Sequence, residues 1–165
     1  MRACGDCSLC CKVMAIDKLE KPAASWCRHC KPGQGCLIYE RRPAECRSFN
    51  CLWLTDDRFG PHWKPNKSKL VLTASQDGIE IRCDPSFPDA WRKQPLRSDI
   101  QKLAASGEIY DVTVLVVVGE SMILVTPEQE FQLGIVRTDQ RIVREFDGKR
   151  VVSATLVNAT DWDEP

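Results

Sequence analysis

The chain carries two cysteine-rich stretches near its N-terminus, CGDCSLCC at residues 4–11 and CRHCKPGQGCLIYERRPAECRSFNC at residues 27–51. Together they hold nine of its ten cysteines, and only Cys83 lies elsewhere. Random scatter along the chain would not produce such a cluster, so the first third has a task that depends on sulfur. In a reducing compartment, clustered cysteines bind metal or carry out redox chemistry more often than they form disulfides.

The overall composition limits the possible partners. Hydrophobic residues make up 43% of the chain. Its 23 basic and 23 acidic side chains give a net charge of zero, so the chain as a whole has no electrostatic attraction for nucleic acid or anionic membranes. The N-terminus lacks the apolar region of a secretory signal, and the longest apolar run, residues 112–118, is too short to cross a bilayer. We therefore expect a cytoplasmic protein with metal ions as partners, an unidentified protein partner left open, and no membrane or nucleic acid. The competing interpretation is a disulfide-rich fold exported by another route.

The distribution of apolar residues divides the chain into three parts. Residues 1–57 contain few of them, which predicts a cysteine-rich metal-binding domain that needs its metal to hold it together. Residues 58–68, RFGPHWKPNKS, predict a linker or ordered loop in which Trp63 packs against the sheet that follows. Residues 69–165 predict a mostly antiparallel sheet domain of the α+β type.

In the third part, alternation of apolar and polar residues predicts strands, and one stretch has helical spacing. The predicted helix covers residues 96–105, with Pro95 before it and Gly107 after it. The predicted strands are residues 69–75, 79–83, 110–118, 122–126, 131–136, 141–146 and 150–157, with turns at 76–78, 119–120 and 147–148. The expected fold class is α+β, with a small cysteine-rich, metal-bound N-terminal segment packed on an antiparallel sheet with one helix.

The spacing of the cysteines is typical of metal ligands. Two intervening residues allow a tight turn to direct two thiolates at one ion, and this Cys-x-x-Cys spacing occurs three times. Gly33 and Gly35 let backbone N–H groups approach sulfur, and such hydrogen bonds tune a thiolate site. The nine candidate ligands are Cys4, Cys7, Cys10, Cys11, Cys27, Cys30, Cys36, Cys46 and Cys51.

The spacing does not identify the metal, because thiolates suit zinc, iron–sulfur clusters and copper(I) alike. The first three cysteines have ferredoxin spacing, but the fourth ferredoxin cysteine and its proline are missing. On one continuous helix, Cys46 and Cys51 would lie about 140° apart and could not face one ion. Either the helix ends near residues 48–50 or the two cysteines serve different sites. We favour two neighbouring sites or one multinuclear site, with zinc or iron as the cofactor and an iron–sulfur cluster as the alternative.

The two stretches together resemble the CxxCxxCC family of zinc- or iron-chelating proteins, also called YkgJ-like. The matching residues of the second stretch are Cys36, Ile38, Tyr39, Arg42, Pro43, Cys46, Arg47, Phe49 and Cys51. The resemblance covers residues 4–54 and implies eight ligands, which are Cys4, Cys7, Cys10, Cys11, Cys27, Cys36, Cys46 and Cys51. This chain adds Cys30, so it stays open whether Cys27 or Cys30 is the ligand. A related motif occurs in flagellin lysine methylases, which keeps an enzymatic role open.

Outside the cysteines, the sequence carries little recognisable chemistry. It has no nucleotide-binding loop, no Ser/His/Asp pattern and only two histidines, and we expect Cys83 to be a buried core residue. The leading hypothesis is a metal-binding protein that chelates zinc or iron through the N-terminal cluster, with no reaction assigned. The alternatives are an iron–sulfur redox protein, an enzyme or protein-modification factor that uses the cluster, and a zinc-stabilised module that binds protein or nucleic acid.

Overall fold

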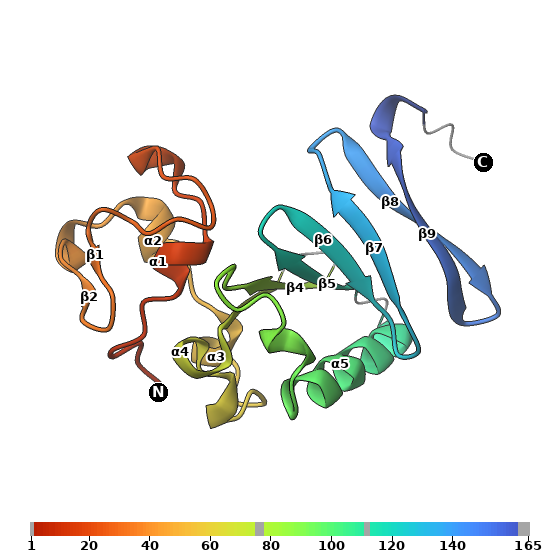
Figure 1. The fold of residues 1–165 in the computed structure, drawn as a ribbon, viewed down its shortest axis with the longest axis horizontal. Helices are drawn as coiled ribbons and strands as arrows, with labels where there is room; N and C mark the ends of the chain where they lie inside the picture. Colours follow the sequence, from red (N-terminus) through yellow and green to blue (C-terminus); the bar gives the residue numbers. More distant parts are fainter. Residues whose placement is uncertain (1, 75–77, 111–112, 162–165) are drawn as a thin grey trace.

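The computed structural model describes residues 2–74, 78–110 and 113–161, without the side chains of residues 107–110. It confirms the predicted α+β class, with a five-stranded sheet, one long helix and a cysteine-rich N-terminal part. Figure 1 shows that part, here called the lobe (residues 2–57), at one end of the molecule and the last two strands at the other. No helix in the described residues is long and apolar enough to cross a membrane.

The lobe is built from very short helices and strands, because prolines and glycines interrupt its sequence and apolar residues are scarce in it. Each covers between two and five residues. In chain order they are α1 (Cys10–Val13), η1 (Asp17–Leu19), β1 (Cys30–Lys31), β2 (Gly35–Cys36), η2 (Tyr39–Arg41), α2 (Ala44–Ser48) and α3 (Leu52–Thr55). Isolated helices this short are not stable in water, so the lobe depends on contacts beyond its own secondary structure.

The helix that carries Cys46 ends near residues 48–50, as one of the two interpretations of Cys46 and Cys51 requires. Helix α2 stops at Ser48, and Phe49 is extended. Cys51 follows as the residue just before α3. The two cysteines therefore lie on separate short helices, and the helical angle between them no longer restricts which sulfurs can meet.

Residues 58–68 connect the lobe to the sheet and are tightly packed. They contain η3 (Pro61–Trp63) and α4 (Pro65–Ser68). Phe59 and Trp63 are only 4% and 2% exposed and meet edge to face, with their ring centroids 5.5 Å apart. Both belong to the main hydrophobic core, which confirms that Trp63 packs against the sheet.

The predicted strands of the third part are present, with their ends shifted by a few residues. The main sheet has the order β3-β4-β5-β6-β7. Its strands are β3 (Leu70–Ala74), β4 (Gly78–Cys83), β5 (Thr113–Val118), β6 (Ser121–Val125) and β7 (Glu130–Ile135). Residues 75–77, from the predicted turn, and residues 111–112, from a predicted strand, lie outside the described residues.

The main sheet is mixed, which the alternation pattern alone did not predict. Three of its pairs are antiparallel, but β4 and β5 are parallel, with Ile81 beside Val116. The parallel pair arises because helix α5 (Leu96–Tyr110) returns the chain from the end of β4 to the start of β5. A short η4 (Ala90–Arg92) precedes α5, and α5 continues five residues beyond its predicted end at Ala105.

The last two strands form a separate antiparallel hairpin. They are β8 (Gln140–Asp147) and β9 (Arg150–Asn158), and η5 (Ala159–Asp161) follows them. Gly148 has φ +61°, as the predicted turn between the strands requires. The Gln129 side chain donates a hydrogen bond to the carbonyl oxygen of Val151, 3.0 Å away, which links the hairpin to the main sheet.

The core lies between α5 and one face of the main sheet. As predicted, Ile81 and Cys83 lie on that face and pack with helix residues such as Ile100. The side chains that are less than 2% exposed are Trp91, Leu70, Leu72, Ile81, Ile100, Leu124, Val71, Val114 and Val116. The lobe contributes a second, smaller cluster in which Leu9 and Val13 pack against Val71 of β3.

We predict that Ile81→Ala lowers the free energy of unfolding by about 2–5 kcal/mol, because it opens a cavity in the core. Ile135→Ala is the matched control on another strand of the same sheet. Ile81 is 0% exposed and Ile135 is 62% exposed, so the control should change stability by less than about 0.5 kcal/mol. Urea unfolding followed by tryptophan fluorescence measures both values. Equal losses would show that the core is placed wrongly.

Candidate metal centre

Electrostatic interactions connect eight of the nine cysteines of the lobe into two groups of thiols. In the first, the charges of Cys4 and Cys7 act on Cys51. In the second, Cys11 interacts with Cys30, and the charges of Cys11, Cys27 and Cys36 act on Cys46. We call them the first thiol group (Cys4, Cys7 and Cys51) and the second thiol group (Cys11, Cys27, Cys30, Cys36 and Cys46). All candidate ligands except Cys10 fall into one of these groups.

Cys10 lies between the two groups. Its side chain is hydrogen-bonded to that of the adjacent Cys11, in the second thiol group. It also packs, together with Cys51 of the first thiol group, against the small cluster of Leu9, Val13 and Val71. The adjacent pair at positions 10 and 11 is therefore the link between the two groups.

Backbone hydrogen bonds explain how the short elements bring the second thiol group together. The N–H of Cys27 donates to the carbonyl oxygen of Cys11 at 3.0 Å, and that of Cys30 donates to Cys27 at 2.9 Å. Strands β1 and β2 pair Cys30 with Cys36 across a tight hairpin. Residues 32–35 turn the chain in this hairpin, and Gly33 and Gly35 both have positive φ.

In the first thiol group, a tight turn brings the two cysteines of the first Cys-x-x-Cys together. The N–H of Cys7 donates to the carbonyl oxygen of Cys4 at 3.0 Å, and Gly5 between them has φ +56°. The Asp6 carboxylate accepts hydrogen bonds from Lys64 at 2.6 Å and from Asn66 at 2.9 Å. The turn is thereby fixed to the segment that leads into the sheet.

The environment keeps several of these thiols protonated at neutral pH. Burial raises the pKa of Cys7, Cys46 and Cys51, and neighbouring cysteine charges raise each of them further. Burial and the charge of Cys11 raise the pKa of Cys30 to about 11. The hydrogen bond with Cys10, followed by burial, raises the pKa of Cys11 well above its usual range. In the metal-free protein these groups are therefore neutral thiols rather than thiolates.

Each thiol group has a lysine close to it. Lys21 is only 7% exposed and donates hydrogen bonds to the carbonyl oxygens of Lys12, at 2.9 Å, and Met14. Burial lowers the pKa of Lys21, whereas Cys27 and other thiols of the second group raise it. Lys64 plays the corresponding part beside Cys7, whose pKa its charge lowers. Sequence reasoning missed Lys21, because its position depends on the bridge between Ile16 and Lys21 and on hydrogen bonds to α1 and the residue after it.

The thiols do not yet form a closed coordination site. All ten cysteines are unpaired, and within the described residues no three Cys, His, Asp or Glu side chains are arranged so that they could hold a metal ion. The donor type fits zinc or iron, because both accept thiolate ligands. Coordination would require side chains within each group to turn toward a common point.

Cys83 stands apart from both thiol groups, as the sequence predicted. It is 3% exposed in the main core, and its Sγ donates to the carbonyl oxygen of Phe87 at 3.1 Å. Burial raises the pKa of Cys83 to about 11. A protonated thiol in this position acts as a small core residue.

No family model, no curated protein and no solved structure matches this chain. What the site can do must therefore be judged from its own residues.

We predict that Cys83→Ser leaves the metal content of the purified protein unchanged and costs modest stability through a buried hydroxyl. Cys46→Ser, by contrast, should lower the metal content, because it removes a member of the second thiol group. Elemental analysis of both variants, purified in parallel without oxygen, makes the comparison. An equal loss of metal would mean that the sheet contributes a ligand.

We also predict that metal binding releases protons. Because the folded protein holds these thiols protonated at neutral pH, each thiol that becomes a ligand must lose about one proton. Adding zinc to the metal-free protein in weak buffer should acidify the solution, and the apparent affinity should fall as the pH is lowered. Binding without proton release would contradict thiolate coordination.

The same pKa shifts set the alkaline stability of the metal-free lobe. The pKa of such a thiol is higher in the folded state than in the unfolded state, so its protonated form stabilises the fold. This stability is present below the usual thiol pKa of 9.0 and is lost as the pH rises toward about 11, the pKa of Cys30. Amide exchange in the lobe should therefore accelerate over that range beyond the intrinsic increase, and by more than exchange in the sheet, where Cys83 is the one described thiol with a raised pKa. Parallel acceleration in both would contradict the assignment.

Proposed function

We propose that this protein binds zinc or iron through the cysteines of its lobe. The observation that carries this is the gathering of eight thiols into two groups, with Cys10 between them, in a part of the chain that has almost no core of its own. Apolar residues would serve a purely structural role better than cysteines, because free thiols are reactive and form only weak hydrogen bonds. The resemblance to the zinc- or iron-chelating CxxCxxCC proteins supports the same function.

The two groups suggest two sites of four ligands each. If Cys10, which like Cys51 packs against the small cluster of Leu9, Val13 and Val71, serves the first site, that site has four thiols: Cys4, Cys7, Cys10 and Cys51. The second site would then use Cys11, Cys27, Cys36 and Cys46. These eight are the ligands that the resemblance implies, and they divide evenly between the groups. Cys30 is left as a fifth thiol of the second thiol group, opposite Cys36 on the hairpin.

Charge supports two cations rather than one. Eight thiolates carry eight negative charges, and two divalent ions would offset half of them. Lys21 lies beside the second thiol group and would offset more. Lys64 lies beside the first thiol group but already pairs with Asp6 at 2.6 Å, and Lys12 pairs with Asp84 at the same distance. The lysines alone therefore leave most of the thiolate charge to be offset by metal ions.

Metal binding would also order the lobe. The thiols are held by turns and two-residue strands rather than by long elements, so side chains can rearrange without breaking the main sheet. When a site forms from such flexible parts, the binding free energy becomes folding free energy. The metal would then supply the stability that the sparse apolar residues of the lobe do not.

Identifying the bound metal would decide between a zinc site and an iron–sulfur cluster. Thiolate ligands hold both, and the five thiols of the second thiol group would also suit a cluster. Zinc thiolates are colourless, whereas iron–sulfur clusters absorb visible light. Clustered cysteines that bind metal are typical of a reducing compartment, so we propose that the protein is cytoplasmic.

We predict that the protein purified without oxygen carries about two metal ions per chain and that Cys51→Ser and Cys46→Ser each lose about one. The double variant should lose both. Elemental analysis with absorption spectra measures content and type together. Protein that holds neither zinc nor iron, with its cysteines joined in disulfides, would refute the proposed function. Complete loss of metal in either single variant would instead indicate one multinuclear site.

The fifth thiol of the second thiol group has its own test. If Cys27 is the ligand and Cys30 is a bystander, Cys30→Ser should keep the full metal content and Cys27→Ser should not. The reverse result would assign Cys30. Cys27 is 6% exposed and Cys30 is more open, so burial favours Cys27 as the ligand.

A further inference from the structure

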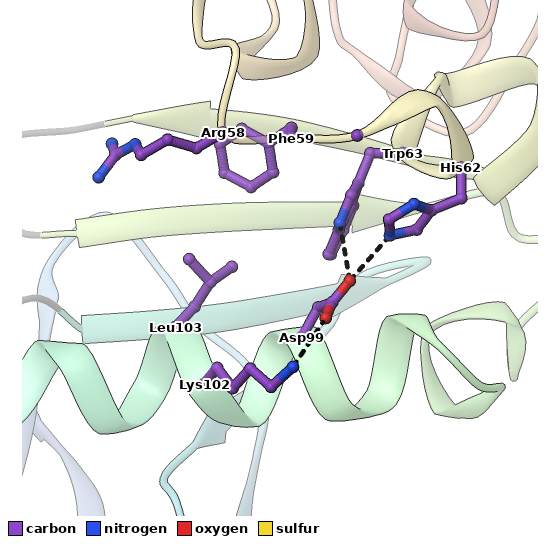
Figure 2. Close-up of a pocket in the computed structure, with 8 residues that line it drawn as sticks. Arg58, Phe59, His62, Trp63, Asp99, Lys102 and Leu103 are labelled. Carbon is purple, nitrogen blue, oxygen red and sulfur yellow. Dashed lines mark hydrogen bonds and ion pairs between the residues drawn. The ribbon is translucent and has the colours of Figure 1, made fainter.

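A pocket of about 390 Å³ lies between residues 58–63 of the connecting segment and helix α5. This volume falls in the range of sites for small molecules. Figure 2 shows that His62, Trp63 and Lys102 point toward Asp99, which projects from α5, whereas Arg58 points away from it. The proposed function uses none of these residues.

Asp99 fixes the orientation of His62. One carboxylate oxygen, Oδ2, lies 2.8 Å from Nε2 of His62 and accepts a hydrogen bond from Nε1 of Trp63 at 3.2 Å (Figure 2). The tryptophan N–H can only donate, and an ionised carboxylate can only accept. Nε2 of a neutral His62 must therefore carry the proton, which leaves the lone pair on Nδ1.

Gly60 keeps the free nitrogen of His62 accessible. A Cβ at position 60 would lie 3.1 Å from Nδ1 and 3.2 Å from the adjacent ring carbon, closer than ordinary contacts allow. Glycine therefore leaves space beside Nδ1, where a ligand hydroxyl can donate a hydrogen bond. The ring is part of an exposed residue, with 41% of its side chain accessible.

Two cations border the same pocket. The Lys102 ammonium lies 3.6 Å from the second oxygen of Asp99, and 79% of its side chain is exposed, so it can turn to a ligand. Arg58 borders the pocket near Phe59 and is paired with Asp56 outside it. Between the polar ends, Leu103 and the edges of the buried aromatic rings supply an apolar wall.

We propose that this pocket binds a small hydroxylated organic anion. A carboxylate or phosphate of the ligand pairs with Lys102, and Arg58 adds positive charge at the rim. A hydroxyl of the ligand donates to Nδ1 of His62, whose tautomer Asp99 holds. The anionic group of the ligand matches Lys102 and Arg58, and its hydroxyl matches Nδ1 of His62. Binding at this site requires no metal ion.

The test is a titration of the intact protein with glycolate, acetate and inorganic phosphate, followed by NMR of the indole N–H signals. The chain has five tryptophans, so the signals other than that of Trp63 serve as internal controls. Glycolate should shift the Trp63 signal saturably in the millimolar range, and acetate, which has no hydroxyl, should bind more weakly. Saturable binding of phosphate at the same signal would widen the ligand class to phosphate esters, and its absence would restrict the class to carboxylates.

Two variants test the assigned contacts. Lys102→Met should weaken glycolate binding about tenfold, because it removes a charge-assisted hydrogen bond. Lys149→Met, which removes the same charge between β8 and β9, is the matched control and should change nothing. His62→Phe should erase the advantage of glycolate over acetate.

Three results would overturn the proposal. One is a Trp63 signal that does not move with any of the three anions. Another is an equal effect of the two lysine variants, which would reduce the binding to general charge. The third is a preference for glycolate that survives in His62→Phe. None of these measurements depends on the metal content of the lobe, so failure here leaves the proposed metal function untouched.

Discussion

Strand β3 is buried on both of its faces, and this double burial joins the lobe to the sheet. Leu70 and Leu72 are 0% and 1% exposed and pack in the main core with α5. Val71 between them is 0% exposed and packs against Leu9 and Val13 of the lobe. Successive side chains of a strand point to opposite faces, so the lobe covers the face of β3 that α5 leaves open. Without that cover, an apolar face of the sheet would meet water.

An ion pair reinforces this junction and fixes its register. The Lys12 ammonium lies 2.6 Å from the Asp84 carboxylate, and their side chains are only 12% and 7% exposed. Such a pair adds little net stability, but separating its members would leave a charge buried without a partner. Lys12 lies on α1 directly after the adjacent cysteines, so the pair also holds the link between the two thiol groups against the sheet. The geometry of the cysteines thus depends on a contact with the body of the protein.

Local pattern predicted most of the fold, and long-range contacts account for what it missed. The strands and α5 follow from side-chain periodicity, which the chain carries within each segment. The parallel pairing of β4 with β5 depends instead on the path of the chain through α5, and no local pattern encodes that path. Helix α5 also runs past Gly107, because a glycine near a helix end permits termination without requiring it. The sequence predicted that Trp63 packs against the sheet, but it did not identify Phe59, which also lies in the main core.

For the candidate site, the sequence identified the residues but not their arrangement. The nine cysteines were recognisable from spacing, whereas their division into two groups arises from the hydrogen bond between Cys27 and Cys11 and from the hairpin of β1 and β2. The cysteines with raised pKa values, which are Cys7, Cys11, Cys30, Cys46 and Cys51, are neutral at neutral pH and therefore do not repel one another. If the lobe binds a metal ion as proposed, the ion would replace their protons and offset part of the thiolate charge.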